Sequence, residues 1–110
     1  WMEDEDYFEF SDDILIASTE KLQFRDTAIH ISSTTDGQLD LVADGAVVID
    51  TAGDITLDAD GGDIFFKDGG TTFGSATNSS GNLIIKSGTT TALTFSGANA
   101  TVALNSRWQL

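Results

Sequence analysis

The chain has 110 residues, no cysteine and no proline, and its 18 acidic and 5 basic side chains give a formal net charge of −13. This balance argues against a nucleic-acid partner, because such binding neutralises phosphates with Lys and Arg, and it disfavours an anionic membrane surface for the same reason. Disulfides and thiolate metal sites are excluded, and no apolar run approaches the length needed to insert into a membrane. One domain is the expectation at this length.

Residues 1–20 form an acidic N-terminal lead-in segment that differs from the rest of the chain. The first six residues, WMEDED, lack the basic region of a secretory signal, and we expect the chain to be an excerpt of a longer protein. Apolar residues alternate over 8–16, which favours two short strands. Ser11 could instead cap a short helix in this interval.

From residue 21 to residue 110, an apolar pair separated by one residue returns about every seven to ten positions between short polar loops. Successive side chains of a strand point to opposite faces, so each pair buries one side of a very short strand. Such repeats cannot bury their apolar faces alone and must stack on copies in the same chain or in partner chains. The predicted core and assembly residues are Leu22, Phe24, Ile29, Ile31, Leu39, Leu41, Val47, Ile49, Ile55, Leu57, Ile64, Phe66, Leu83, Ile85, Leu93, Phe95, Val102 and Leu104.

Glycine and aspartate mark the corners between these expected strands, because both residues tolerate the positive φ of tight turns. Between about residues 69 and 81 the repeated apolar pairs are missing, and the stretch is rich in Thr, Gly, Ser and Asn. This interval predicts a looser loop that bulges outward. The predicted corners are Asp36-Gly37, Asp44-Gly45, Gly53, Gly61-Gly62 and Gly69-Gly70.

The pattern predicts an all-β fold, for which two architectures are open. A compact antiparallel sandwich has short alternating strands at a similar spacing. The very short strands, the near absence of Asn-Gly and Gly-Asn hairpin signals and the monotonous repeat favour a solenoid-like β-helix. At roughly 27 residues per turn the chain gives only about four turns, with open edges. We therefore expect three identical chains intertwined as a homotrimeric triple β-helix over residues 21–110.

The amino-acid sequence of several segments resembles a repeat found in tail-fibre and other structural proteins of tailed bacteriophages. The resemblance rests on residues 21–33 (KLQFRDTAIHISS) and 36–44 (DGQLDLVAD), and residues 53–68 (GDITLDADGGDIFFKD) and 81–86 (GNLIIK) are similar to the same repeat. It implies a homotrimeric, non-enzymatic fibre shaft of the virion, without a cofactor and assembled in the host cytoplasm. The implied partners are the other two copies, neighbouring fibre domains and a host cell-surface receptor.

Few residues offer other chemistry. His30, the one histidine, should face outward because its two isoleucine neighbours face inward, so we expect no axial metal. The corner that holds Asp58, Asp60 and Asp63 is a calcium candidate, but it lacks the spacing of an EF-hand and the third glycine of the calcium-binding β-roll repeat. Solvated corners are the simpler expectation for these carboxylates.

The leading functional hypothesis is a rigid trimeric shaft that links a virion to a receptor-binding tip. One alternative is a glycan- or calcium-binding adhesin module. Another is a fragment of a polysaccharide-degrading tailspike, which needs two carboxylates about 5 to 9.5 Å apart. The sequence selects no such pair, so we assign no catalytic residue.

Overall fold

A computed structural model describes residues 7–99 and 101–105, and all of the regular structure in them is β. The predicted all-β class is therefore confirmed for the described part of the chain. None of these residues lies in a helix long and apolar enough to cross a membrane. The chain divides into two compact units, Trp1–Ala52 and Gly53–Leu110. The first strand begins at Lys21.

The first unit holds a three-stranded antiparallel sheet in the order β1-β2-β3. Its strands are β1 (Lys21–Phe24), β2 (Asp26–Ser32) and β3 (Asp40–Val42). The β1–β2 turn is tight, with Arg25 at a φ of 72°. The register shifts between Gln23 and Phe24, which marks a bulge beside this turn.

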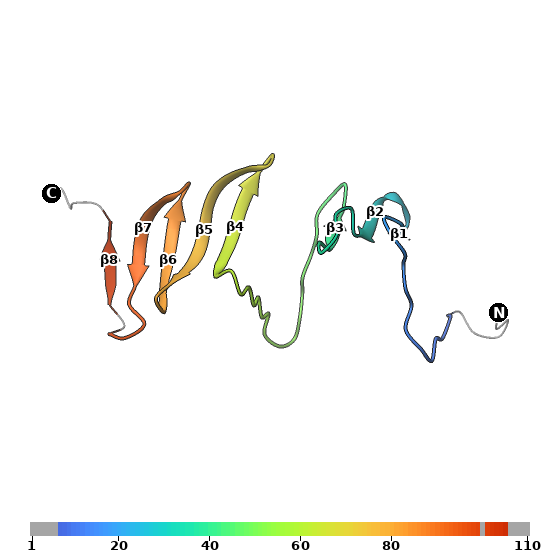
Figure 1. Ribbon diagram of the computed structural model, residues 1–110, viewed down its shortest axis with the longest axis horizontal. Coiled ribbons are helices and arrows are strands. Elements are labelled where there is room, and N and C mark those ends of the chain that lie inside the picture. The colour runs from blue at the N-terminus through green and yellow to red at the C-terminus, as the bar shows by residue number, and fades with distance from the viewer. Residues whose placement is uncertain (1–6, 100, 106–110) are drawn as a thin grey trace. The chain divides into compact units, whose positions relative to one another are not determined.

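The second unit is a five-stranded antiparallel meander in which every strand pairs with its neighbour in sequence (Figure 1). Its strands are β4 (Asp63–Asp68), β5 (Thr71–Ser79), β6 (Asn82–Ser87), β7 (Thr90–Phe95) and β8 (Val102–Leu104). Two-residue turns join the first four strands, and they contain Gly70, Gly81 and Gly88 at φ angles of 84°, 83° and 61°. Such positive-φ turns match the right-handed twist of the strands they connect.

The prediction of a looser loop at about residues 69–81 is wrong. This interval contains β5, the longest strand of the structure, and the turns on either side of it. Few apolar residues mark β5 because it is an interior strand whose inward positions are small, and hydrogen bonds to β4 and β6 on both sides hold it in place. The sequence reasoning also sought Asn-Gly and Gly-Asn as hairpin signals, whereas Gly69-Gly70 and Ser80-Gly81 make the turns.

Several expected strands are absent from the single chain. Residues 7–20 and 43–62 contain no strand, so the predictions for the lead-in segment and for the pairs Val47/Ile49 and Ile55/Leu57 are wrong for one chain by itself. Alternation of apolar and polar residues makes a segment compatible with a β-sheet. A strand forms only where a neighbouring strand pairs with its backbone N–H and C=O groups. Residues 1–6 of the lead-in lie outside the described part.

The described strands form two open antiparallel sheets and no closed solenoid coil. Of the predicted corners, Gly37, Gly62, Gly69 and Gly70 have positive φ. Their positions at or beside turns agree with the sequence prediction. In one chain, the strands that contain the repeated apolar pairs therefore form antiparallel hairpins.

Candidate functional site

The five-stranded sheet gathers the predicted apolar pairs on one of its faces. Residues directly opposite each other in an antiparallel ladder point to the same side, so the strand register assigns the faces. One row crosses all five strands, and the next row joins Leu83, Phe95 and Val102. We call this surface the apolar face; it consists of Ile64, Phe66, Ala76, Leu83, Ile85, Leu93, Phe95, Val102 and Leu104.

The apolar face is uncovered within this chain. No hydrophobic side chain among the described residues is buried, and Phe66, Leu83, Val102 and Leu104 on this face are between 43% and 56% exposed. Its apolar side chains fill one row across all five strands, three positions of a second row that also holds Asn78, and the Phe66 position of a third row. Exposed apolar side chains gathered on one face and rimmed by polar residues make this face a candidate interaction surface.

A buried glycine allows two aromatic rings to gather at one corner of the apolar face. The Phe66 and Phe73 ring centroids are 6.2 Å apart. A Cβ atom added at Gly74 would lie 2.8 Å from the Lys86 carbonyl oxygen and 3.8 Å from the Phe66 ring. Only glycine therefore lets β5 approach β6 this closely beneath Phe66.

The opposite face of the same sheet carries a polar network. Ser75, 2% exposed, has its hydroxyl 3.1 Å from the Thr77 hydroxyl. Thr77 donates its hydrogen to an Asp63 carboxylate oxygen at 2.6 Å. These residues alternate in sequence with members of the apolar face, and they share their side of the sheet with Phe65, which is 57% exposed, and with Ile84.

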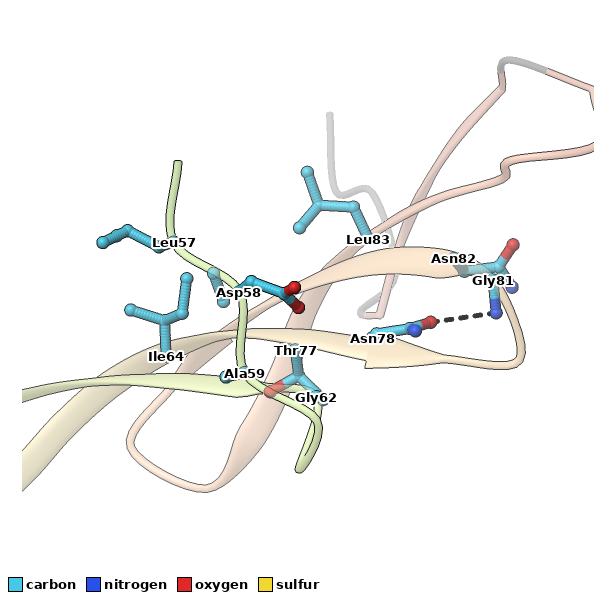
Figure 2. Close-up of a pocket in the computed structure, with 11 residues that line it drawn as sticks. Leu57, Asp58, Ala59, Gly62, Ile64, Thr77, Asn78, Gly81, Asn82 and Leu83 are labelled. Atoms are coloured by element: carbon cyan, nitrogen blue, oxygen red, sulfur yellow. Dashed lines mark hydrogen bonds between the residues drawn. The ribbon is translucent and has the colours of Figure 1, made fainter. Parts of the chain in front are cut away.

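A groove of about 400 Å³ opens at the end of the apolar face near the β5–β6 turn. Figure 2 shows Leu57, Ile64 and Leu83 around it, together with the Asp58 carboxylate. No aromatic ring lines the groove, so it offers no platform on which a sugar could stack. Its apolar walls suit an aliphatic side chain better than a glycan.

Two asparagines brace the turns around this groove. The Gly81 backbone N–H donates to the Asn78 side-chain oxygen at 2.9 Å (Figure 2). The Gly97 N–H donates to the Asn82 side-chain oxygen at 3.1 Å, which ties the β7–β8 connection to the start of β6. These bonds fix loop backbone, so the asparagines act as structural braces.

The smaller sheet of the first unit repeats the same pattern on a reduced scale. Leu22, Ile31 and Leu41 lie opposite one another in register, and Leu22 and Leu41 are 46% and 58% exposed. Their row forms a second apolar strip that the described residues leave uncovered. Leu39, predicted for the same face, comes just before β3 and is 72% exposed.

His30 lies on the side of β2 away from Ile31, as the alternation predicted. It is half-buried there, and its Nδ1 atom is buried without a hydrogen-bond partner, as is the Ser32 hydroxyl oxygen. Gln23 and Val42 lie opposite His30 in the neighbouring strands. The imidazole thus has no second ligand beside it in the ladder, and its position gives no support to a metal role.

Asp40 organises the loop between β2 and β3. Its carboxylate accepts hydrogen bonds from the Thr34 hydroxyl at 2.7 Å, the Thr34 backbone N–H at 3.2 Å and the Gln38 amide at 2.5 Å. Hydrogen bonds from Thr34 and then Gln38, with a smaller contribution from His30, hold the pKa of Asp40 below its ordinary value of 3.8. Asp40 is therefore a structural acceptor for the loop.

The calcium candidates do not converge within the chain. The described residues contain no group of three or more acidic or metal-ligating side chains close enough to hold an ion. Asp58 lines the groove, and the Asp63 carboxylate accepts a hydrogen bond from the Thr77 hydroxyl. Sequence proximity of Asp58, Asp60 and Asp63 therefore does not produce a coordination site in one copy.

Sequence reasoning found most of the apolar face and missed the residues that shape it. Gly74, Phe73 and the braces Asn78 and Asn82 fell in or beside the interval that was expected to be a loop. Small residues at Gly74 and Ala76, spaced by two, were the signal that β5 continues the apolar alternation.

Comparison with known proteins adds no relative: no protein-family model, curated protein or solved structure matches the chain.

Proposed function

We propose that the chain is a structural segment of a bacteriophage tail fibre, in which three copies form a rigid shaft between the virion and a receptor-binding tip. The observation that carries the proposal is the uncovered apolar face of the second unit. A folded chain with no buried hydrophobic side chain among its described residues lacks the main source of stability for a domain of this size. Further copies would supply the missing burial.

Three-fold association suits this surface. A single sheet with one apolar face is completed by packing that face against another apolar layer. Three such faces that converge on one axis would bury each other and leave the opposite faces of the sheets, with Thr77 and Asp63, on the outside. One copy forms only open sheets. We propose that the intertwined β-helical winding expected from the sequence forms only when copies assemble.

The acidic surface is compatible with a shaft. With a formal charge of −13 on each copy, assembled fibres repel one another and remain dispersed. The repulsion between copies within one trimer opposes assembly, so the apolar face must outweigh it. At physiological salt the screening length is about 8 Å, which confines this repulsion to near neighbours.

No specific observation favours the alternative functions of an adhesin module or a polysaccharide-degrading tailspike fragment. The groove lacks an aromatic platform, and the calcium candidates do not converge in one copy. Sedimentation combined with light scattering tests the shaft directly: we expect an elongated particle of three chains. A chain that binds a glycan, melts at a lower temperature after chelation or shortens a polysaccharide would overturn the proposal in favour of an alternative.

A further inference from the structure

Four Asp-Gly pairs punctuate the chain, and this dipeptide can rearrange covalently without an enzyme. In such a pair the glycine nitrogen attacks the side-chain carboxyl of the aspartate, because glycine has no Cβ atom to crowd the approach and restricts its own backbone least. The structure differs among the four pairs in how firmly it holds the backbone. The pairs are Asp36-Gly37, Asp44-Gly45, Asp60-Gly61 and Asp68-Gly69.

Backbone hydrogen bonds or strand pairing hold three of these pairs in place. The two residues that flank Asp36-Gly37 are joined by a backbone hydrogen bond of 3.0 Å, and those that flank Asp60-Gly61 by one of 2.8 Å. Asp68 ends β4 opposite Thr71, so Gly69 begins the tight turn into β5. Such turns fix the dihedral angles of their central residues, and the aspartate cannot swing toward the next nitrogen until the turn opens.

Asp44-Gly45 lacks this support. The pair lies at a bend just after β3, and both of its residues are exposed. Among the described residues, neither the Asp44 carboxylate nor the Gly45 N–H has a hydrogen-bond partner. A Cβ atom added at Gly45 would meet nothing within 4 Å, so the surroundings are open as well. Nothing therefore prevents the Asp44 carboxyl from approaching the Gly45 nitrogen.

We infer that Asp44-Gly45 is a site of spontaneous isoaspartate formation, and that in the folded chain it reacts faster than the other three pairs. The Gly45 nitrogen forms a bond to Asp44 Cγ, a carbon–oxygen bond of the protonated carboxyl breaks, and water leaves with the amide hydrogen. A second water then opens the resulting succinimide ring. Opening at Cγ restores aspartate, whereas opening at the main-chain carbonyl gives isoaspartate. The inference is independent of the proposed function, because every step lies within one chain.

The product is compatible with the fold. Isoaspartate adds one methylene group to the backbone and keeps the net charge, but it breaks the regular spacing of N–H and C=O groups that a strand needs. β3 ends at Val42, and no strand lies between residues 43 and 62. Both sheets therefore retain their ladders, and isoaspartate accumulates at position 44 in chains that remain folded.

Isotope labelling of the folded 110-residue chain tests the inference. Each succinimide ring that opens in water enriched in heavy oxygen takes up one labelled atom, whichever product it gives. Tandem mass spectrometry of proteolytic peptides locates the label, and electron-transfer fragmentation distinguishes isoaspartate from aspartate. Since a turn hydrogen bond must open before the ring closes, we expect label at Asp44 to appear at least about fivefold faster than at the other three pairs. Equal rates, or a faster rate at any other pair, would overturn the inference.

The unfolded chain supplies the first control. In concentrated urea the turns and the β4–β5 ladder are lost, so the four pairs should take up label at similar rates. A preference for Asp44 that persists in urea would show that the folded backbone does not select the site, and this result too would overturn the inference.

Two variants supply the matched controls. Gly45→Ala has open space for its methyl group and needs no positive φ, so it should fold normally while the methyl group crowds the attacking nitrogen. Asp44→Glu keeps the charge but requires a larger ring, which closes far more slowly. We expect both variants to lose most of the labelling at position 44, with unchanged β-sheet circular dichroism. Undiminished labelling there in Gly45→Ala would contradict the assigned chemistry.

Discussion

Leu93 and Thr94 are adjacent in β7 and give the sharpest test of the apolar face. Leu93 lies on that face opposite Ile85 and Leu104, whereas Thr94 points to the other side. Both side chains are half-buried in one copy, so an aspartate at either position meets similar surroundings until copies assemble. The comparison therefore isolates what assembly adds.

The expected magnitudes differ by several kcal/mol. Full burial of a leucine is worth about 1.5 to 3 kcal/mol, so in an isolated chain a half-buried Leu93 accounts for about 1 kcal/mol. In an assembled axis, Leu93→Asp forfeits about 2 kcal/mol of burial and adds a carboxylate desolvation cost of several kcal/mol. A total of about 5 kcal/mol per chain lowers the association constant by about three to four powers of ten.

The assay is light scattering coupled to size-exclusion chromatography on both variants at equal concentration. Leu93→Asp should elute as dissociated chain, whereas Thr94→Asp should retain the assembled mass, because Thr94 lies on the side of the sheet opposite to the proposed assembly surface. Equal losses for the two variants would refute the assignment of the assembly surface. Retention of the assembled mass by Leu93→Asp would refute it as well.

Gly74→Ala should lower the free energy of unfolding by about 1 to 3 kcal/mol in denaturant titrations, because the new methyl group meets the Lys86 backbone 2.8 Å away. Gly45→Ala, with open space around its Cβ and no positive φ, is the control and should be neutral or slightly stabilising; a smaller loss at position 74 than at position 45 would contradict the packing. The depressed pKa of Asp40 contributes stability that is present above its ordinary value of 3.8 and is lost as the pH falls through the lower folded-state pKa. Thermal melts from pH 6 down to about pH 2 should therefore show a steeper acid-side decline for the native chain than for Asp40→Asn, and parallel curves would show that the hydrogen bonds to Asp40 do not contribute.

The sequence predicted the facing of side chains better than it predicted the pairing of strands. The spacing of two placed Ile64 with Phe66 and Leu93 with Phe95 correctly, because side-chain alternation is a local property of extended backbone. Strand pairing depends on turns, and Gly69-Gly70 and Ser80-Gly81 form tight turns here without the Asn-Gly pair typical of hairpins.

The candidate site was predictable where it is made of apolar pairs and unpredictable where it depends on close backbone approach. Gly74 is required by a carbonyl oxygen of Lys86, twelve residues away in sequence, and no local pattern reveals that neighbour. Likewise, the Asp63 carboxylate accepts a hydrogen bond from Thr77, fourteen residues away in sequence, and no local pattern reveals that partner. The pairs Val47/Ile49 and Ile55/Leu57 have the spacing of a strand, yet residues 43–62 contain none, because alternation alone does not supply a neighbouring strand.

The mass of the native particle tests the central claim most directly. Three chains of 11.6 kDa give about 35 kDa, and native mass spectrometry over a dilution series into the low micromolar range measures this without assumptions about shape. We predict a three-chain particle. On dilution, it should either persist or dissociate directly into unfolded chains, without a stable folded monomer. A folded, cooperatively melting single chain at low micromolar concentration would contradict it.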